Sequence, residues 1–320
     1  MDETVITAGP GQARRAEALA FIVACQQDPA TSTAYLGEDP AGIEAELEGL
    51  DRPWLTGWRA VRASGKGSGE GSGKGSGENS GDITAACTVD WDAEPSMAWI
   101  HGPWGAPGAV DRHGHALLAA IDRLVPAEIT HLEVCGHVAN TAMASLADRL
   151  GWVATEVNFA LAAPATQARA WTLPDAGPAP GVRIRRMVPA DVVPLEPLHA
   201  AEFGAAYATA AQLASGYHTV VAEDGDGTLL GYAAGTLQDD GSAYVDFTAV
   251  VPAARRRGLG RRLVVELVRV LLDAGRPETV HLTVRESRAA AHALYLSLGM
   301  RQDAALRGYR GTRPVTAPVS

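Results

Sequence analysis

The sequence predicts an α/β protein of two consecutive domains, each a mostly antiparallel mixed sheet flanked by helices. The chain has 320 residues, more than the roughly 250 to 300 that one core usually organises. Hydrophobic residues make up 47% and charged residues 20%, so there is enough apolar surface for two cores. Segments typical of strands and helices also follow the same order in both halves of the chain.

In the first half, hydrophobic periodicity and turn residues define the expected elements. They are a helix within about 13–27, hairpin strands at 57–62 and 83–89, a strand near 97–101, a helix near 112–124, a strand at 129–134, a helix at 140–150 and a strand from Trp152. Between the hairpin strands, residues 65–81 alternate glycine with Lys, Ser and Glu, which predicts a flexible loop.

The second half repeats this order after a segment rich in proline, alanine and glycine. Its expected elements are a strand at 182–187, helical segments to about 215, strands at 219–223, 229–237 and 243–250, a helix at 259–273, a strand at 279–284, a helix at 288–298 and a final strand from about 302. The predicted organisation is therefore a first domain over 1–163, a linker over 164–180 and a second domain over 181–320.

Two short matches indicate that the halves arose by internal duplication. Residues 131–134 and 281–284 both read His-Leu-x-Val, and 149–152 and 297–300 both carry Leu-Gly at the second and third positions. The matches come in the same order in each half, as an internal repeat requires.

Charge and composition exclude several functions. A formal net charge of -10 disfavours nucleic acid and anionic lipid as partners, because these are bound by excess Lys and Arg. There is no apolar run of the ~18 residues that a membrane span needs, and no basic segment before an apolar core at the start, so we expect a cytoplasmic protein. Three widely spaced cysteines predict no disulfide framework, and no metal site is expected. Either a monomer or a homodimer is compatible with the sequence.

The most informative segment follows the strand at 243–250. It carries Pro252, three consecutive arginines from Arg255, then Gly258 and Gly260 at the start of an amphipathic helix. The beginning of a helix presents unpaired backbone N–H groups and the positive end of the helix dipole, and glycine lets an anion approach the backbone. This segment therefore predicts a phosphate site.

The spacing Arg255-x-x-Gly258-x-Gly260 after a strand resembles the pyrophosphate loop of the GCN5-related N-acetyltransferase (GNAT) family. The resemblance covers about 180–310, and the first half looks like a degenerate copy of the same domain. It implies acetyl-CoA as cosubstrate. The residues expected to bind it are Thr248, Ala249, Val250, Arg255, Arg256, Arg257, Gly258, Leu259, Gly260, Arg261 and Arg288. The family often has asparagine where this chain has Arg288, so that contact stays open.

The same resemblance implies that Tyr295 is the general acid that protonates the departing thiolate, and the less favoured alternative is a core aromatic. Asp246 is the leading candidate for deprotonating the amine, and a solvated or arginine-paired carboxylate is the alternative. Strand alternation would put Tyr244, Asp246, Thr248 and Val250 on one face. His199 and Glu202 are weaker base candidates that could be ordinary exposed helix residues.

The first half lacks these features. Two prolines, Pro103 and Pro107, interrupt the position of the loop, the arginine cluster is missing, and Ala147 stands where the tyrosine would be. Its tryptophans at 54, 58, 91, 99 and 104 could wall an acceptor cleft, although tryptophan is more often a core residue.

We therefore expect an N-acetyltransferase that acts on a primary amine of a small molecule or protein, by direct attack through a tetrahedral intermediate. Two alternatives remain. One is a non-catalytic acyl-CoA-binding regulatory module. The other is an acetyltransferase of a thiol metabolite, since the layout is also similar to that of mycothiol synthases. Binding of nucleic acid through the three arginines is disfavoured by the acidic chain.

Overall fold

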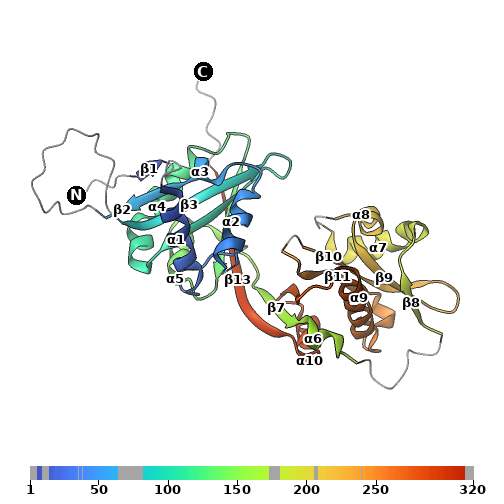
Figure 1. The fold of residues 1–320 in the computed structure, drawn as a ribbon. Helices are drawn as coiled ribbons and strands as arrows, with labels where there is room; N and C mark the ends of the chain where they lie inside the picture. The colour runs from blue at the N-terminus through green and yellow to red at the C-terminus, as the bar shows by residue number, and fades with distance from the viewer. Residues whose placement is uncertain are drawn as a thin grey trace, which may run out of the picture. The chain divides into compact units, whose positions relative to one another are not determined.

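A computed structural model describes residues 6–8, 14–34, 36–37, 39–63, 82–172, 181–204, 208–238 and 240–313. It has two compact units, one formed by Met1–Val157 with Ala305–Ser320 and the other by Asn158–Ala304. Each unit is a mixed sheet with helices packed against it (Figure 1). The predicted fold class is confirmed.

The first unit has a sheet with the strand order β1-β2-β3-β4-β5-β13, in which only β4 and β5 are parallel. Its strands are β1 (Ile6–Ala8), β2 (Arg59–Arg62), β3 (Ile83–Asp92), β4 (Met97–Gly105), β5 (His131–His137), β6 (Val153–Ala154) and β13 (Arg301–Thr312). Its helices are α1 (Arg15–Gln26), α2 (Pro40–Glu48), α3 (Trp54–Gly57), α4 (Pro107–Asp122) and α5 (Thr141–Arg149). Helices α4 and α5 share one core with the sheet, and α1, α2 and α3 share another.

The second unit has the strand order β7-β12-β11-β10-β9-β8, with β11 and β12 parallel. Its strands are β7 (Asn158–Pro164), β8 (Arg183–Arg186), β9 (His218–Glu223), β10 (Leu229–Leu237), β11 (Ala243–Val250) and β12 (Thr279–Arg285). Its helices are α6 (Ala165–Arg169), α7 (Val192–Phe203), α8 (Ala210–Ser215), α9 (Leu259–Gly275) and α10 (Ala289–Ser297). One core lies between the sheet and α9, and a second lies under α7 and α8. These opposite faces carry the two sides of the candidate site.

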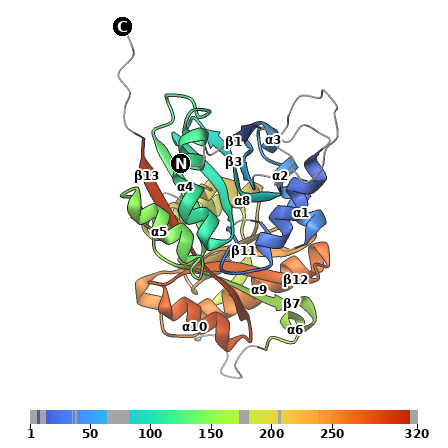
Figure 2. The ribbon, with the colours of Figure 1, turned by 90° about the vertical axis from the view of Figure 1, so that its left-hand side faces the viewer.

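The two halves of the sequence exchange strands. Strand β7 pairs antiparallel with β12 over its whole length, and the two run side by side in Figure 2. Strand β13, at the end of the second half, pairs with β5 of the first unit from Leu306 to Thr312. The sequence instead predicts that the first domain ends at residue 163 and that a linker covers 164–180. Residues 158–169 form β7 and α6, and Trp171 is buried in the core of the second unit.

Periodicity fails here because alanine and proline dominate this segment, while backbone pairing with β12 does not depend on a hydrophobic pattern. Residues 173–180 of the predicted linker and the predicted loop at 65–81 lie outside the described residues.

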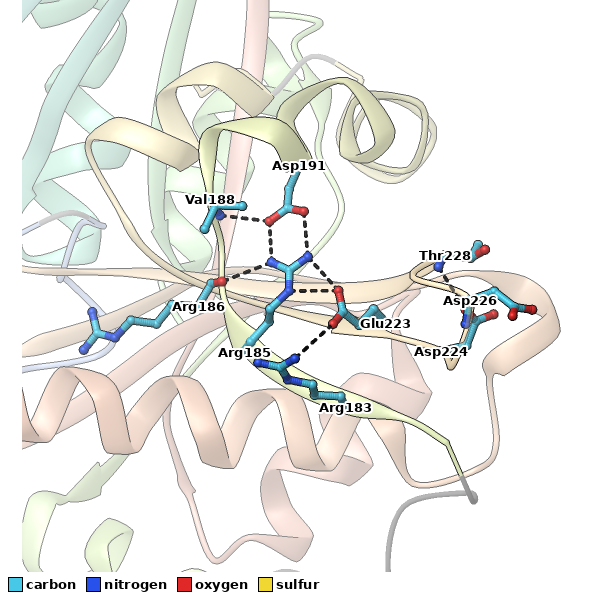
Figure 3. A network of polar contacts seen from close by, with 9 residues as sticks. All are labelled: Arg183, Arg185, Arg186, Val188, Asp191, Glu223, Asp224, Asp226 and Thr228. Atoms are coloured by element: carbon cyan, nitrogen blue, oxygen red, sulfur yellow. Dashed lines mark hydrogen bonds and ion pairs between the residues drawn. The ribbon is translucent and has the colours of Figure 1, made fainter.

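Arg185 joins the edge strand β8 to the residue before α7 and to the end of β9 (Figure 3). Its guanidinium donates to both carboxylate oxygens of Asp191, at 2.6 and 2.8 Å, and to Glu223 at 2.8 Å. Asp191 directly precedes α7, and Glu223 is the last residue of β9. This planar, multiply bonded contact fixes where α7 begins. It thereby helps to position the helix that carries His199 and Glu202.

Candidate functional site

The segment between β11 and α9 forms a loop that leaves the start of the helix open. Pro252–Ala254 makes one 3-10 turn, and Gly258 caps α9 in the left-handed conformation with φ of 75°. No side chain caps this end. The first main-chain bond of the helix runs from Arg262 N–H to the Gly258 carbonyl at 3.2 Å, so the N–H groups of the first turn have no acceptor within the helix. Such a terminus can bind an anion.

Two further features distinguish this loop: open space at Gly258 and an uncommon backbone conformation at Arg256. A Cβ built on Gly258 would meet no atom within 4 Å, so the space above the glycine is open. Arg256 has a positive φ of 64°, a conformation that is uncommon for a residue with a side chain. A strained backbone of this kind occurs most often at functional sites.

The arginines expected to bind phosphate differ in their contacts within the protein. Arg255 folds back toward β11, where its Nε donates to the Val250 carbonyl at 2.8 Å. Arg261 donates to the Ser297 hydroxyl at 2.9 Å, and Arg288 is bound to Glu202. Arg256 and Arg257 are exposed and make no ion pair with any described residue. These last two are therefore the arginines whose charge is available at the loop.

Strands β11 and β12 separate next to this loop. Their registered pairs are Ala243 with Val280 and Tyr244 with His281, and no pair follows along these fully described strands. Beyond Tyr244, β11 therefore has no registered pair with β12. Every buried backbone polar group needs a hydrogen-bond partner, from the protein or from a ligand. The gap offers N–H donors from the end of β11, where Thr248, Ala249 and Val250 lie.

Tyr295 lies on α10 and is buried in the core beneath α9, with 7% of its surface exposed. Burial raises the pKa of its phenol, and the nearby Thr248 hydroxyl opposes this without reversing it. Thr248 Oγ1 is buried and has no hydrogen-bond partner among the described residues. Tyr295 is thus a core aromatic, as one sequence interpretation held. Its phenol also stays protonated beside a strand that borders the gap, which a general acid requires.

The expectation that Tyr244, Asp246, Thr248 and Val250 share one face is wrong. Ala234 of β10 pairs with Phe247 while its neighbour Gly235 pairs with Val245, so Asp246 is the extra residue of a β-bulge. A bulge reverses the alternation that follows it. Before it, Val245 packs under α9, whereas after it Phe247 packs under α7 and α8. Tyr244 therefore faces the α7 side, and Thr248 and Val250 face the α9 side.

Asp246 accepts a hydrogen bond from the Thr236 hydroxyl at 2.9 Å. Burial raises the pKa of both Tyr217 and Tyr244, and the negative charge of Asp246 adds to this shift in each. The carboxylate is therefore close to both phenols. This arrangement gives an anionic, aromatic environment that suits a cationic amine.

The two weaker base candidates are not exposed helix residues. The ring of His199 is buried, with Nε2 2.7 Å from the Ala208 carbonyl and Nδ1 2.5 Å from the Tyr232 hydroxyl. Because a carbonyl only accepts, Nε2 must be the donor, and Nδ1 then accepts from the tyrosine. Both ring nitrogens of His199 are therefore engaged within the fold. The Glu202 side chain is 18% exposed and pairs with Arg255 and Arg288.

In the first unit, the corresponding position is built differently. Helix α4 begins at Pro107, almost directly after β4 ends at Gly105, so no loop like that before α9 is present between these two elements. A Cβ on Gly105 would lie 2.6 Å from the Thr84 carbonyl, so the end of β4 packs tightly against β3. The side chains of Trp54, Trp58 and Trp104 are fully buried against one another in the core of the unit. Their suggested role in walling an acceptor cleft is therefore wrong.

Over the described ranges of the chain, none of the helices has both the length and the apolar character for a membrane span. Within the same ranges, no three His, Cys, Asp or Glu side chains are grouped to hold a metal ion.

Comparison with known proteins shows which proteins this chain is similar to. Residues 190–300 match the model of the acetyltransferase (GNAT) family. The chain is 38% identical over 101 residues to the N-alpha-acetyltransferase RimI of Mycobacterium tuberculosis, a match that covers 31% of this chain and 61% of the relative. The chain thus spans less than two thirds of that protein.

Two solved structures resemble the whole chain. A GCN5-related N-acetyltransferase from Sphaerobacter thermophilus superposes with a TM-score of 0.68 at 20% identity, covering 99% of this chain and 98% of the other. A tandem GNAT protein from the clavulanic acid biosynthesis pathway gives 0.59 at 16% identity, covering 98% and 99%. At these identities the likeness establishes the fold alone.

Proposed function

We propose that this chain transfers an acetyl group from acetyl-CoA to a primary amine of a small molecule or protein, because residues 190–300 match the acetyltransferase (GNAT) family model and the chain is similar to an N-alpha-acetyltransferase. The observation that carries this proposal is the uncapped start of α9 beside the gap between β11 and β12. In this proposal an anion-binding helix start and the N–H donors at the end of β11 lie next to each other there. A long ligand with a diphosphate at one end and a carbonyl at the other suits both.

In this proposal the N–H groups around Gly258 and Gly260 bind the diphosphate of the cosubstrate, and Arg256 and Arg257 add positive charge. The thioester supplies an activated acyl carbon. Donors at the end of β11, around Thr248 to Val250, stabilise the oxyanion that forms when an amine attacks it. Tyr295, kept protonated by burial, gives its proton to the departing sulfur.

Asp246 is proposed to bind the incoming ammonium and to accept its proton, directly or through water. It lies on the α7 side of the sheet, whereas Tyr295 and Thr248 lie on the α9 side. The bulge at Asp246 reverses which side chains of β11 face α7 and which face α9. The acceptor and the cosubstrate would therefore approach the gap from opposite faces of the sheet. This separation lets an amine reach the acyl carbon without displacing the thiolate's proton donor.

The test is release of free thiol when purified protein, acetyl-CoA and a panel of amines are combined. The panel includes peptides with free and with blocked N-termini, because the relative at 38% identity is named an N-alpha-acetyltransferase. We expect thiol release that depends on a free amine and disappears when the amine is omitted. Tight binding of acetyl-CoA with no turnover across the panel would instead favour a non-catalytic acyl-CoA-binding module.

A further inference from the structure

Glu202, in the last turn of α7, is the most heavily engaged acidic side chain near the site. Its Oε1 accepts from Arg255 Nη2 at 2.5 Å and its Oε2 accepts from Arg288 Nη1 at 2.8 Å. Its main-chain carbonyl also accepts from Arg288 Nη2, at 3.1 Å. Only 18% of the Glu202 side chain is exposed, against 44% and 47% for the two arginines. One carboxylate thus pairs with two guanidinium groups.

These contacts join the segments that surround the gap. Arg255 belongs to the loop before α9 and also donates to the Val250 carbonyl, at the end of β11. Arg288 directly precedes α10, the helix that carries Tyr295. Glu202 therefore connects α7 with the loop, with the end of β11 and with the start of α10. Among the described residues at the site, no other carboxylate pairs with arginines of both the loop and the start of α10.

The carboxylate is unsuited to act as a base. Burial acts to raise the pKa of Glu202, but hydrogen bonds from Arg288 and Arg255 outweigh it and hold the pKa below its ordinary value. A carboxylate stabilised in its charged form has little tendency to take a proton near neutral pH.

We propose that Glu202 is a positioning residue for the cosubstrate, holding Arg255 and Arg288 so that the loop before α9 keeps its open form. The inference rests on the proposed function. Without the carboxylate, two like charges would lie close together with nothing between them, and they would separate. The loop contains Arg256 in a left-handed conformation, which persists only while its surroundings hold it. Its release would disorder the N–H groups that are to bind the diphosphate.

The experiment compares Glu202→Gln with Glu266→Gln, a matched control. Glu266 accepts from Arg269 at 2.7 Å on the exposed side of α9, so its replacement also breaks one carboxylate–arginine pair. For Glu202→Gln we expect the calorimetric Kd for coenzyme A and the KM for acetyl-CoA to rise about tenfold, with kcat within about twofold, as loss of a charged hydrogen-bond network predicts. Glu266→Gln should leave all three values unchanged. A purely structural role would lower the melting temperature without this split between KM and kcat.

Arg288→Gln provides a second route if the first variant folds poorly. It should weaken coenzyme A binding in the same direction, and the double variant Glu202→Gln/Arg288→Gln should be no worse than the more damaging single variant, because both remove one linkage. If the wild type gives no heat with coenzyme A, the proposed function itself fails. If the wild type binds and Glu202→Gln binds equally well or more tightly, the positioning role is overturned.

Discussion

Replacing Gly258 by alanine tests the anion site directly. The residue has φ of 75°, where a side chain costs about 1–2 kcal/mol. No atom lies within 4 Å of the added Cβ, so no clash adds to this cost in the free protein. The melting temperature of the second unit should therefore fall by roughly 2–8 °C. When coenzyme A binds, the methyl group would occupy the space that the diphosphate needs. Losing one charge-assisted hydrogen bond costs about 1.5–3 kcal/mol, or roughly 10–100-fold in Kd.

Gly227 offers a control with the same backbone. It has φ of 81° and no atom within 4 Å of an added Cβ, and it lies in the turn between β9 and β10. Gly227→Ala should lower the melting temperature as much as Gly258→Ala and leave coenzyme A binding unchanged. Calorimetric titration and thermal melts of both variants separate the two effects. Equal affinity of Gly258→Ala and wild type for coenzyme A would refute the anion site.

Tyr295→Phe should lower kcat by about 100-fold or more without changing the Kd for coenzyme A. Rate assays measure kcat and calorimetry measures the Kd. An unchanged kcat would show that Tyr295 is not the general acid. Because burial raises the pKa of Tyr295 above its ordinary 10.0, the wild-type rate should not fall on the alkaline side until the pH exceeds 10. Asp246→Asn should lower kcat by about 100-fold and abolish the acidic limb of the pH–rate profile, and persistence of that limb would assign it to another group. Arg185→Ala should destabilise the second unit by about 3 kcal/mol, measured by denaturant unfolding, since it removes the guanidinium that pairs with Asp191 and leaves Glu223 only its longer contact with Arg183 at 3.9 Å. The pKa of Asp191 is lowered chiefly by its hydrogen bond from Arg185, so this stabilisation is present above its ordinary 3.8 and is lost as the pH falls through the native value. Acid unfolding of Arg185→Ala should lack that component.

The fold could be predicted from the sequence wherever the signal is local. Helix α9, expected at 259–273, spans Leu259–Gly275, and strand β11 spans the expected 243–250. The amphipathic pattern of a long helix and the alternating pattern of a strand are each formed by residues close together in the sequence. Both can therefore be recognised without knowing which element packs against them. The short helices α3 and α6, of four and five residues, were not predicted, because such segments carry too few repeats of the helical period, and the nine-residue helix α2 was also missed.

Pairing could not be predicted in the same way. The duplicated order of elements implies that each half completes its own sheet, yet β7 pairs with β12 and β13 pairs with β5. Both alternatives satisfy the same hydrophobic pattern, so only the tertiary contacts distinguish them. The bulge at Asp246 is hidden for a related reason, since it is defined by register against β10 and the strand itself reads as regular alternation.

The sequence by itself determined the character of the loop before α9, because a strand, a glycine-bearing turn and a helix start place free N–H groups and positive charge together through chain connectivity alone. The tertiary structure alone decided which arginines remain available there. Arg255 and Arg288 are drawn to Glu202, 53 and 86 positions away along the chain, while Arg256 and Arg257 stay exposed. A guanidinium on a flexible side chain pairs with a carboxylate that the fold brings within reach, and the neighbouring sequence does not indicate which carboxylate that is.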